Sequence, residues 1–271
     1  MQEKQSPHFS VKRTVIGALL LLLALGLTTL PASVFSAIIQ VFSLALMYEF
    51  HRAAFPKGAK HIALLGLSLN LLITTLVQSQ LQESSLLILL GLLLISGSIM
   101  KIPGRPIWLK NSDRFIFGIL YTAVLPSHLF LLRAEPEGIY LLLLLVTVVV
   151  VTDSAAYFVG KRFGRHLLWQ VVSPNKSWEG AVGGLLLGGL AGFLFINSTN
   201  LLGLSWIIAI VLSAALCIGT ILGDLVESSI KRHLQIKDFS ELIPEHGGLL
   251  DRTDSMIFVA TVLYWSQLLI R

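Results

Sequence analysis

Long uninterrupted apolar runs are the feature that most constrains the fold of this chain. Runs of roughly 17 to 25 apolar residues alternate with short polar or charged stretches. A helix of about 20 apolar residues matches the hydrocarbon core of a bilayer, and it satisfies its own backbone hydrogen bonds. Charged residues make up 13% of the chain, about half the share in soluble domains. The sequence therefore predicts an all-α, polytopic integral membrane protein.

The breaks between the apolar runs predict nine transmembrane helices. Their expected limits are 14–30, 33–48, 60–78, 84–100, 115–132, 138–160, 178–196, 203–230 and 254–270. The first run, with its basic start, also fits a cleaved secretory signal, but the spans that follow at once favour an uncleaved helix. We expect two regions: residues 1–135, with five spans and no motif, and residues 136–271, with four spans and the motif-bearing loops.

The basic residues set the expected orientation. If the N-terminus is cytoplasmic, all of the 20 Lys and Arg residues except Arg133 and Arg271 fall in cytoplasmic segments. Short loops rich in Lys and Arg stay in the cytoplasm, so the C-terminus is expected on the far side. The two longest connections, 161–177 and 231–253, are then cytoplasmic. The net charge of +5 follows from this topology and requires no nucleic-acid partner.

Three acidic residues lie more than one residue inside the predicted spans, toward their cytoplasmic ends. They are Asp153 in the sixth span and Asp224 and Glu227 in the eighth. A carboxylate at mid-membrane costs about 2.5–3.5 kcal/mol, so such groups usually face a cavity or a partner. Any one of them could simply pair with a nearby Lys. Three at one depth, beside basic loops, favour a functional site.

Helical spacing brings several of these groups onto one face of the eighth span. Asp224, Glu227 and Lys231 are separated by three and four residues, with Ser228 among them. Asp251 and Asp254 stand at the start of the ninth span, where Asp254 is a candidate N-cap.

Carboxylates without nearby His or Cys suit a hard cation, Mg²⁺ above all, and Mg²⁺ is commonly shared with substrate phosphates. The basic residues that could bind those phosphates are Lys176, Lys231, Arg232, Lys237 and Arg252.

Glycine-containing segments have two possible interpretations. Residues 173–180 (SPNKSWEG) combine ordinary capping residues with Lys176, so they could form either a helix start or a phosphate cradle. The repeat of Gly180, Gly184, Gly188 and Gly192 favours close helix packing, within or between subunits, over ligand binding. His246 and the two glycines after it form either a flexible turn or a nest of amides for an anion.

These residues resemble the phosphatidate cytidylyltransferase, or CDP-diacylglycerol synthase, family. That family's signature reads Ser-x-apolar-Lys-Arg, four residues, Lys-Asp, and then His-Gly-Gly-apolar-x-Asp-Arg-x-Asp. Residues 229–254, SIKRHLQIKDFSELIPEHGGLLDRTD, fill every specific position. Weaker matches are residues 153–160 and the SPNKSWEG segment, where Ser177 replaces the usual Thr. Ser240 and Glu245 stand where the family often has Gly. The motif-bearing resemblance covers about residues 150–271.

The resemblance implies an activity and its setting. CMP passes from CTP to phosphatidic acid, giving CDP-diacylglycerol and pyrophosphate for phospholipid biosynthesis, with Mg²⁺. It also implies a homodimer, and it allows a monovalent cation such as K⁺ in the same site. The setting is the inner membrane of a bacterium, with the active site facing the cytoplasm and residues 136–271 as the catalytic region.

Specific roles follow from the motif positions. Asp224 and Asp251 are the expected metal carboxylates, with Glu227 as a further cation ligand. The residues expected to act in catalysis are Asp224, Asp251, Lys231, Arg232 and Arg252. Those expected to bind substrate are Ser173, Lys176, Lys237, His246, Asp153 and Asp254. The lipid phosphate, already an anion, would attack the α-phosphorus of CTP, so no protein nucleophile is needed.

Two other functions fit parts of the pattern. A CTP-dependent polyprenol or lipid kinase would use similar residues but would release CDP instead of pyrophosphate. A secondary transporter would use the membrane carboxylates as ion sites. The chain shows no pair of interrupted spans in corresponding halves, and its charges gather at one side of the membrane, which disfavours a transporter.

Overall fold

The computed structural model describes residues 11–55, 60–79, 114–243 and 247–270, which are almost entirely helical. Seven helices in these ranges are long and apolar enough to cross a membrane. They are α2 (Ala32–Ala54), α3 (Lys60–Gln78), the helix Arg114–Ala134, α7 (Gly138–Phe163), α8 (Trp178–Thr199), α9 (Trp206–Leu234) and α10 (Leu250–Ile270). A shorter apolar helix, α1 (Val11–Thr28), precedes them. The predicted all-α membrane architecture is confirmed, whereas the expected span 84–100 lies outside the described residues.

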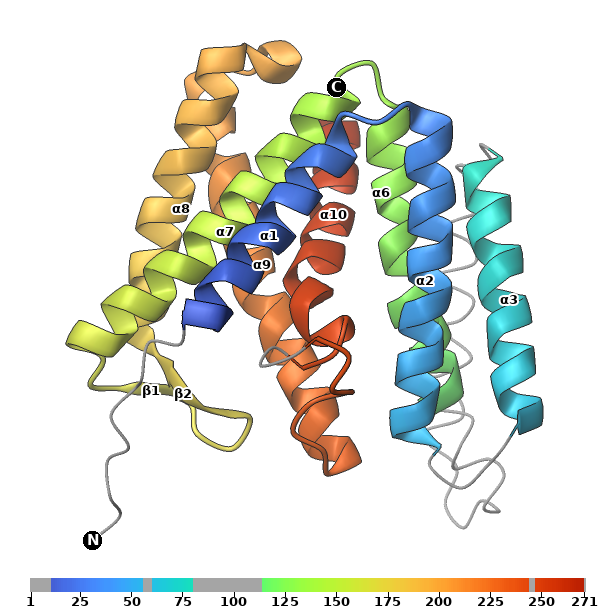
Figure 1. The fold of residues 1–271 in the computed structure, drawn as a ribbon. Coiled ribbons are helices and arrows are strands. Elements are labelled where there is room, and N and C mark those ends of the chain that lie inside the picture. The colour runs from blue at the N-terminus through green and yellow to red at the C-terminus, as the bar shows by residue number, and fades with distance from the viewer. Residues whose placement is uncertain (1–10, 56–59, 80–113, 244–246, 271) are drawn as a thin grey trace, which may run out of the picture.

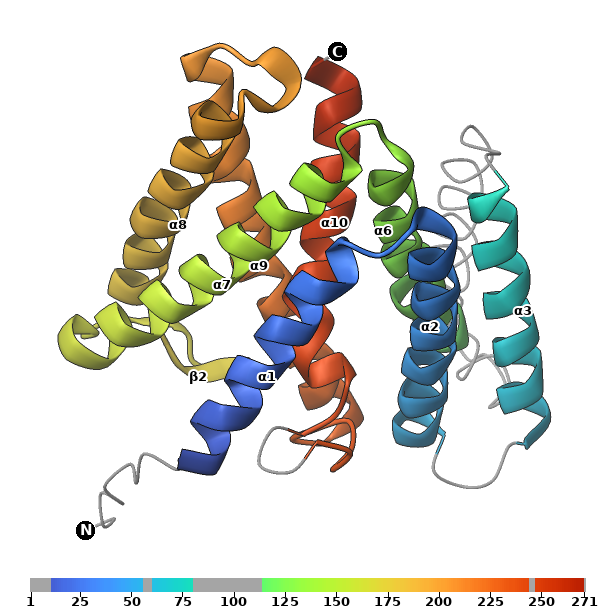
Figure 2. The same cartoon turned by 45° about the horizontal axis from the view of Figure 1, so that its top comes forward.

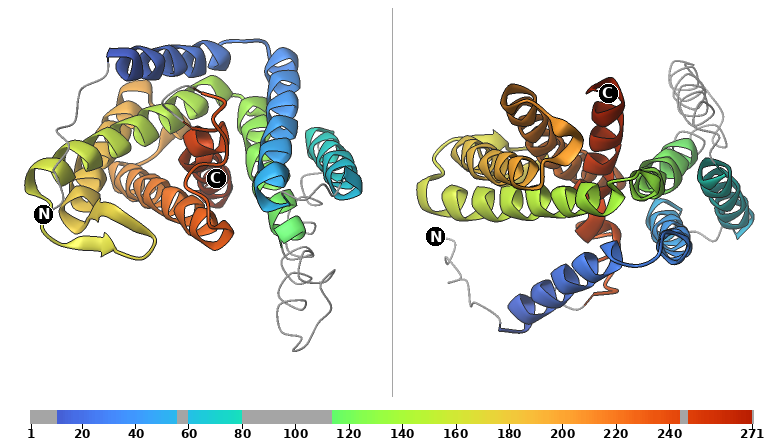
Figure 3. Two further views of the ribbon diagram at one scale, coloured as in Figure 1. Left: turned by 60° about the horizontal axis from the view of Figure 1, so that its bottom comes forward. Right: turned by 90° about the horizontal axis from the view of Figure 1, so that it is seen from above.

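The helices form two groups that meet at α10 (Figure 1). In one group, α7, α8 and α9 pack against one another and α10 packs against α9 and α7. In the other, α2 packs on α3 and on the helix Arg114–Ala134, which also contacts α10. Helix α1 lies outside the first group, alongside α7 (Figures 2 and 3). Because α10 belongs to both groups, its first turns can join residues from both halves of the chain.

The helix Arg114–Ala134 contains an irregular turn beside a proline. A π-helical turn, η1 (Leu120–Val124), leads into α6 (Leu125–Ala134), whose second residue is Pro126. Proline has no N–H, so the carbonyl of Thr122 loses its usual helical donor. Asn70 Nδ2 donates to that carbonyl at 3.1 Å, and Ser43 Oγ donates to it as well. Both donors are fully buried, which explains why α2 and α3 carry polar residues inside the protein.

The glycine repeat of α8 lies against α7 and α9. Gly180, Gly184, Gly188 and Gly192 are all buried. A Cβ at Gly184 would lie 2.9 Å from the carbonyl oxygen of Thr152, and one at Gly192 would lie 2.9 Å from the side chains of Val148 and Ser213. Thus the expected role in close packing is met within the subunit.

A short hairpin interrupts the helical pattern between α7 and α8. Strand β1 (Leu167–Trp169) pairs antiparallel with β2 (Ser173–Ser177), an element that the sequence did not predict. The SPNKSWEG motif spans strand β2 and the first three residues of α8, and Ser177 Oγ accepts a hydrogen bond from Gly180 N as the N-cap of α8. Figure 1 shows the hairpin at the end of the molecule where α7 and α9 finish and α8 and α10 begin. The loops that carry the motifs therefore lie at one end of the bundle.

The packing of α8 predicts opposite effects at two neighbouring glycines. A Cβ at Gly188 would collide with the hydroxyl of Thr152 and lie 3.0 Å from Cys217 Sγ, whereas one at Gly189 meets nothing within 4 Å. Overpacking costs about 1–3 kcal/mol. We expect Gly188→Ala to lower the midpoint of thermal unfolding in detergent by several degrees, at roughly 2–4 °C per kcal/mol.

Gly189→Ala is the matched control, because alanine improves helix propensity at a position with open space. Its unfolding midpoint should stay unchanged or rise slightly. Equal losses in the two variants would contradict the packing described for this face of α8.

Candidate active site

A polar cavity of 700 Å³ opens where the ends of α7 and α9 meet the hairpin and the starts of α8 and α10. Most residues that the sequence singled out line it. They are Asp153, Ser173, Lys176, Asp224, Glu227, Lys231, Asp251, Arg252 and Asp254. Residues separated by a hundred positions in sequence therefore face one space.

Three carboxylates form the centre of this cavity. One oxygen from each of Asp224, Glu227 and Asp254 lies within 4.8 Å of the others. Glu227 is only 2% exposed, and its Oε1 atom has no hydrogen-bond partner among the described residues. A buried carboxylate oxygen without a partner is costly, and a hard cation would satisfy it. We call these three residues the acidic cluster.

Two lysines balance part of this negative charge. Lys231 Nζ lies 2.7 Å from Glu227 Oε2 and 2.9 Å from Asp251 Oδ1, so it joins α9 to α10. Lys176, on β2, pairs with Asp224 Oδ2. The predicted polar face of α9 is thus present, and Ser228 Oγ also lies 3.4 Å from Asp224 Oδ1.

Asp251 anchors the loop between α9 and α10. Its Oδ2 atom accepts hydrogen bonds from Gly248 N at 2.7 Å and Phe239 N at 2.9 Å, while Oδ1 accepts from Lys231. An ionised carboxylate has about four acceptor positions, so one remains for another ligand. The expectation that Asp254 caps this helix is wrong, because α10 begins four residues earlier, at Leu250. Asp254 instead lies one turn inside the helix and faces the acidic cluster.

The paired glycines of the loop are required by close contacts. Gly247 has φ +84°, in the region that favours glycine. A Cβ at Gly248 would overlap the carboxylate of Glu49 and lie 3.0 Å from Asp251 Oδ2. The two glycines therefore form a tight turn between two carboxylates.

Glu49, near the end of α2, is a site residue that the sequence interpretation missed. It is 6% exposed, and its carboxylate accepts hydrogen bonds from Leu249 N at 3.0 Å and Leu250 N at 2.7 Å. Ser240 Oγ donates to the same carboxylate. Glu49 thus satisfies free amides at the start of α10. The sequence held one sign of this role, an acidic residue at the end of an otherwise apolar span. Because Glu49 lies in no motif, that sign did not predict a contact with the site.

Two predicted residues, Arg232 and Lys237, lie at the margin of the site, and a third is not described by the structure. Arg232 does not line the cavity, and its Nε donates to the carbonyl of Val172 at 3.2 Å, which ties α9 to the hairpin. Lys237 is exposed on the loop after α9 and does not line the cavity either. His246 lies outside the described residues. Their roles in binding or catalysis remain predictions.

Taken together, the lining suits phosphates and a divalent cation. The cluster offers only carboxylate oxygens, which favour Mg²⁺ over softer metals. One of them, Oε1 of Glu227, has no hydrogen-bond partner among the described residues. Lys161, Lys176, Lys231 and Arg252 supply positive charge around it. Such an arrangement can hold a cation and several phosphate groups at once.

Comparison with known proteins identifies the family. The family described as "Cytidylyltransferase family" matches residues 11–269 of this chain. The chain belongs to the cytidylyltransferase family. Enzymes of this family generally use a divalent metal, and the acidic cluster is a possible place for one.

Curated relatives come from several bacteria and bear the name phosphatidate cytidylyltransferase. The Haemophilus influenzae protein is 48% identical over 123 residues, which cover 44% of this chain and 43% of that protein. The Staphylococcus saprophyticus protein is 40% identical over 151 residues, covering 55% and 56%. The Bacillus subtilis protein is 43% identical over 114 residues, covering 42% of each. The chain thus spans about half the length of the curated relatives it matches.

The contacts of Glu49 predict that α2 holds the start of α10, which carries Asp251. Glu49→Ala would leave two amides and one hydroxyl without their acceptor, at about 1–3 kcal/mol for each buried group. We expect a lower midpoint of thermal unfolding and faster hydrogen exchange at the amides of Leu249 and Leu250.

Ser240→Ala is the control, because it removes one contact of Glu49 and leaves both amides paired. It should reduce stability less and leave the exchange of those amides slow. If Glu49→Ala behaved like Ser240→Ala in both measurements, the carboxylate would not be what holds the start of α10.

Proposed function

We propose that this protein transfers CMP from CTP to phosphatidic acid and releases CDP-diacylglycerol and pyrophosphate, at the cytoplasmic face of the inner membrane of a bacterium. The observation that carries the proposal is the acidic cluster flanked by Lys176 and Lys231 at one end of a helical bundle. A lipid phosphate lies at that depth in a bilayer, and a nucleotide can reach it from water. The names of the curated relatives support the same reaction.

The reaction requires two polyanions to meet. An oxygen of the lipid phosphate forms a bond to the α-phosphorus of CTP, and the bond from that phosphorus to the bridging oxygen breaks. The bonding pair leaves with pyrophosphate. Because the attacking oxygen is already negative at neutral pH, positioning and charge neutralisation are the main tasks for the protein.

The basic side chains divide these tasks in our proposal. Lys176 and Ser173 hold phosphates of the nucleotide beside the start of α8, where the helix dipole adds positive character. Lys231 and Arg252 steady the attacking and leaving oxygens, with Arg232 beside them. Lys231 is well fixed for this role, since two carboxylates hold its ammonium group.

The proposed divalent cation is Mg²⁺. Asp224 and Glu227 would hold it together with Asp254, and the remaining acceptor position of Asp251 makes that residue a further ligand. When bound, Mg²⁺ would neutralise negative charge on phosphate oxygens. Asp153 lines the same cavity from α7 and could serve a second cation such as K⁺. A homodimer, which the resemblance implies, would be checked by molar-mass measurement in detergent.

Product analysis separates the proposed reaction from its alternatives. Purified protein would be incubated with α-labelled CTP, phosphatidic acid and a Mg²⁺ series. The proposal requires label in a lipid product and one pyrophosphate for each labelled lipid. Release of labelled CDP with an unlabelled lipid would indicate a kinase. Ion-driven uptake into proteoliposomes without CTP would indicate a transporter.

Asp224→Asn should abolish most of this transfer. The change keeps the shape of the side chain but removes charge from the acidic cluster and from the pair with Lys176. We expect kcat/KM to fall by about 100-fold or more, the size associated with losing one charge-stabilising group in a transition state. Labelled CMP transfer at saturating Mg²⁺ gives the measurement.

Glu241→Gln is the matched control, since it removes an exposed carboxylate from the loop before α10 and leaves the cavity lining intact. Its transfer rate should equal that of the parent. Near-normal transfer by well-folded Asp224→Asn protein would show that the acidic cluster does not serve the reaction.

A further inference from the structure

A second cavity, of 440 Å³, lies between α1 and the helices α2, α6, α7 and α10. Among its described lining residues, only Thr28, Arg252 and Thr253 are polar. The two threonine hydroxyls are satisfied within their own helices, since they donate to the carbonyls of Leu25 and Leu249 at 2.7 and 2.9 Å. Apart from Arg252, the lining therefore offers little to water, and apolar cavities of this kind favour hydrocarbon.

The first turns of α10 separate this apolar cavity from the charged one. The residues of α10 that line the charged cavity are Asp251, Arg252, Asp254 and Ser255. Those that line the apolar cavity are Arg252, Thr253, Met256 and Ile257. Both sets follow the three- and four-residue spacing of a helix face. Arg252 belongs to both linings, so a ligand that touches it can extend into either cavity.

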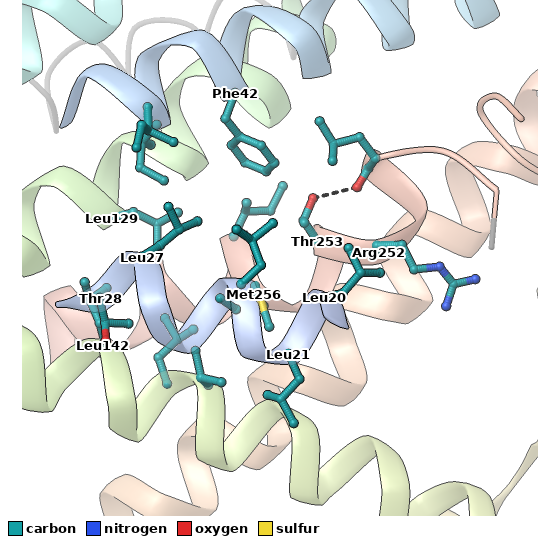
Figure 4. Close-up of a pocket in the computed structure, with 18 of the residues that line it drawn as sticks. Leu20, Leu21, Leu27, Thr28, Phe42, Leu129, Leu142, Arg252, Thr253 and Met256 are labelled. Atoms are coloured by element: carbon teal, nitrogen blue, oxygen red, sulfur yellow. Dashed lines mark hydrogen bonds between the residues drawn. The ribbon is translucent and has the colours of Figure 1, made fainter. Parts of the chain in front are cut away.

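The wall that α1 contributes to the apolar cavity is about as long as the hydrocarbon layer of one leaflet is thick. Its α1 lining runs from Gly17 to Thr28, roughly 16 Å of helix at 1.5 Å per residue. Half of the hydrocarbon core of a bilayer is about 15 Å. Figure 4 shows Arg252 at one end of the cavity and Thr28 with Leu142 toward the other. The cavity thus extends away from Arg252 over a length that can hold part of a lipid chain.

We propose that this cavity receives one acyl chain of the lipid substrate and that its lining selects among chains. The inference rests on the proposed function, because the lipid phosphate must lie near Arg252 in the charged cavity. Leu20 and Leu21 of α1 and Met256 of α10 all contribute to the lining of this cavity (Figure 4). A chain already in the bilayer gains nothing from leaving water, so selection comes from packing: chains that fill the cavity make more van der Waals contacts with its walls than short ones.

Blocking the cavity should remove this preference. Leu21→Trp places a large ring in the cavity, and Leu20→Trp is a second variant of the same design. We expect the ratio of kcat/KM for dioleoyl to dioctanoyl phosphatidic acid to fall about tenfold or more, as for a misfit in an apolar pocket. The KM for CTP should not change, because α1 contributes nothing to the described lining of the charged cavity.

Leu22→Trp is the matched control. Leu22 is the next residue of α1, is 65% exposed and does not line the cavity. It should keep the parent's chain-length ratio. Equal ratios in the Leu21→Trp, Leu22→Trp and parent proteins would overturn the inference while leaving the proposed function intact. Failure of the parent to transfer CMP to any phosphatidic acid would instead overturn the proposed function.

A measurement on the unchanged protein covers the case in which the tryptophan variants do not fold. Phosphatidic acid with a diazirine at mid-chain would be irradiated with the protein in phosphatidylcholine vesicles. The inference predicts label on the cavity-lining residues Leu20, Leu21 and Met256, and loss of that label when plain phosphatidic acid is added. Labelling confined to outward residues such as Leu19 and Leu22, insensitive to that competitor, would contradict it.

Discussion

The site depends on one constraint: the negative charges of its carboxylates, at the end of the bundle where α7 and α9 finish, must be balanced by nearby cations and N–H groups. Five acidic side chains line one cavity, where their like charges repel one another unless cations lie between them. Lys231 binds two of them, Lys176 binds a third, and backbone amides hold Asp251. Since removing one partner would leave an uncompensated charge, the site and the packing of α9 on α10 depend on each other.

The same contacts explain why separate parts of the chain form one unit. The start of α10 is held from one side by Lys231 of α9, through Asp251, and from the other by Glu49 of α2. Phe239 of this loop is buried in an apolar cluster with Phe50 and Leu250. Helix α2 therefore contributes to the site, although its sequence contains no motif. The expected boundary at residue 135 places all motifs in the second region. The contacts that position these motifs nevertheless come from both regions.

Local periodicity in the sequence predicted much of this arrangement. Contacts between residues far apart in the sequence could not be predicted from it. The spans follow from the length of the apolar runs, and the polar face of α9 follows from the spacing of Asp224, Glu227 and Lys231. The role of Glu49 could not be predicted, because its partners lie 200 residues away. The position of Asp254 was misread for a related reason: the loop that sets the start of α10 is fixed by tertiary contacts, and helix boundaries depend on such contacts.

The location of a bound divalent ion tests the central claim most directly. Crystals grown with Mn²⁺, a substitute for Mg²⁺ that prefers the same oxygen ligands, would give an anomalous difference peak. We predict a peak within bonding distance of carboxylate oxygens from both Asp224 and Asp254, next to the unpartnered oxygen of Glu227. A peak elsewhere in the protein, with none at these carboxylates, would contradict the account.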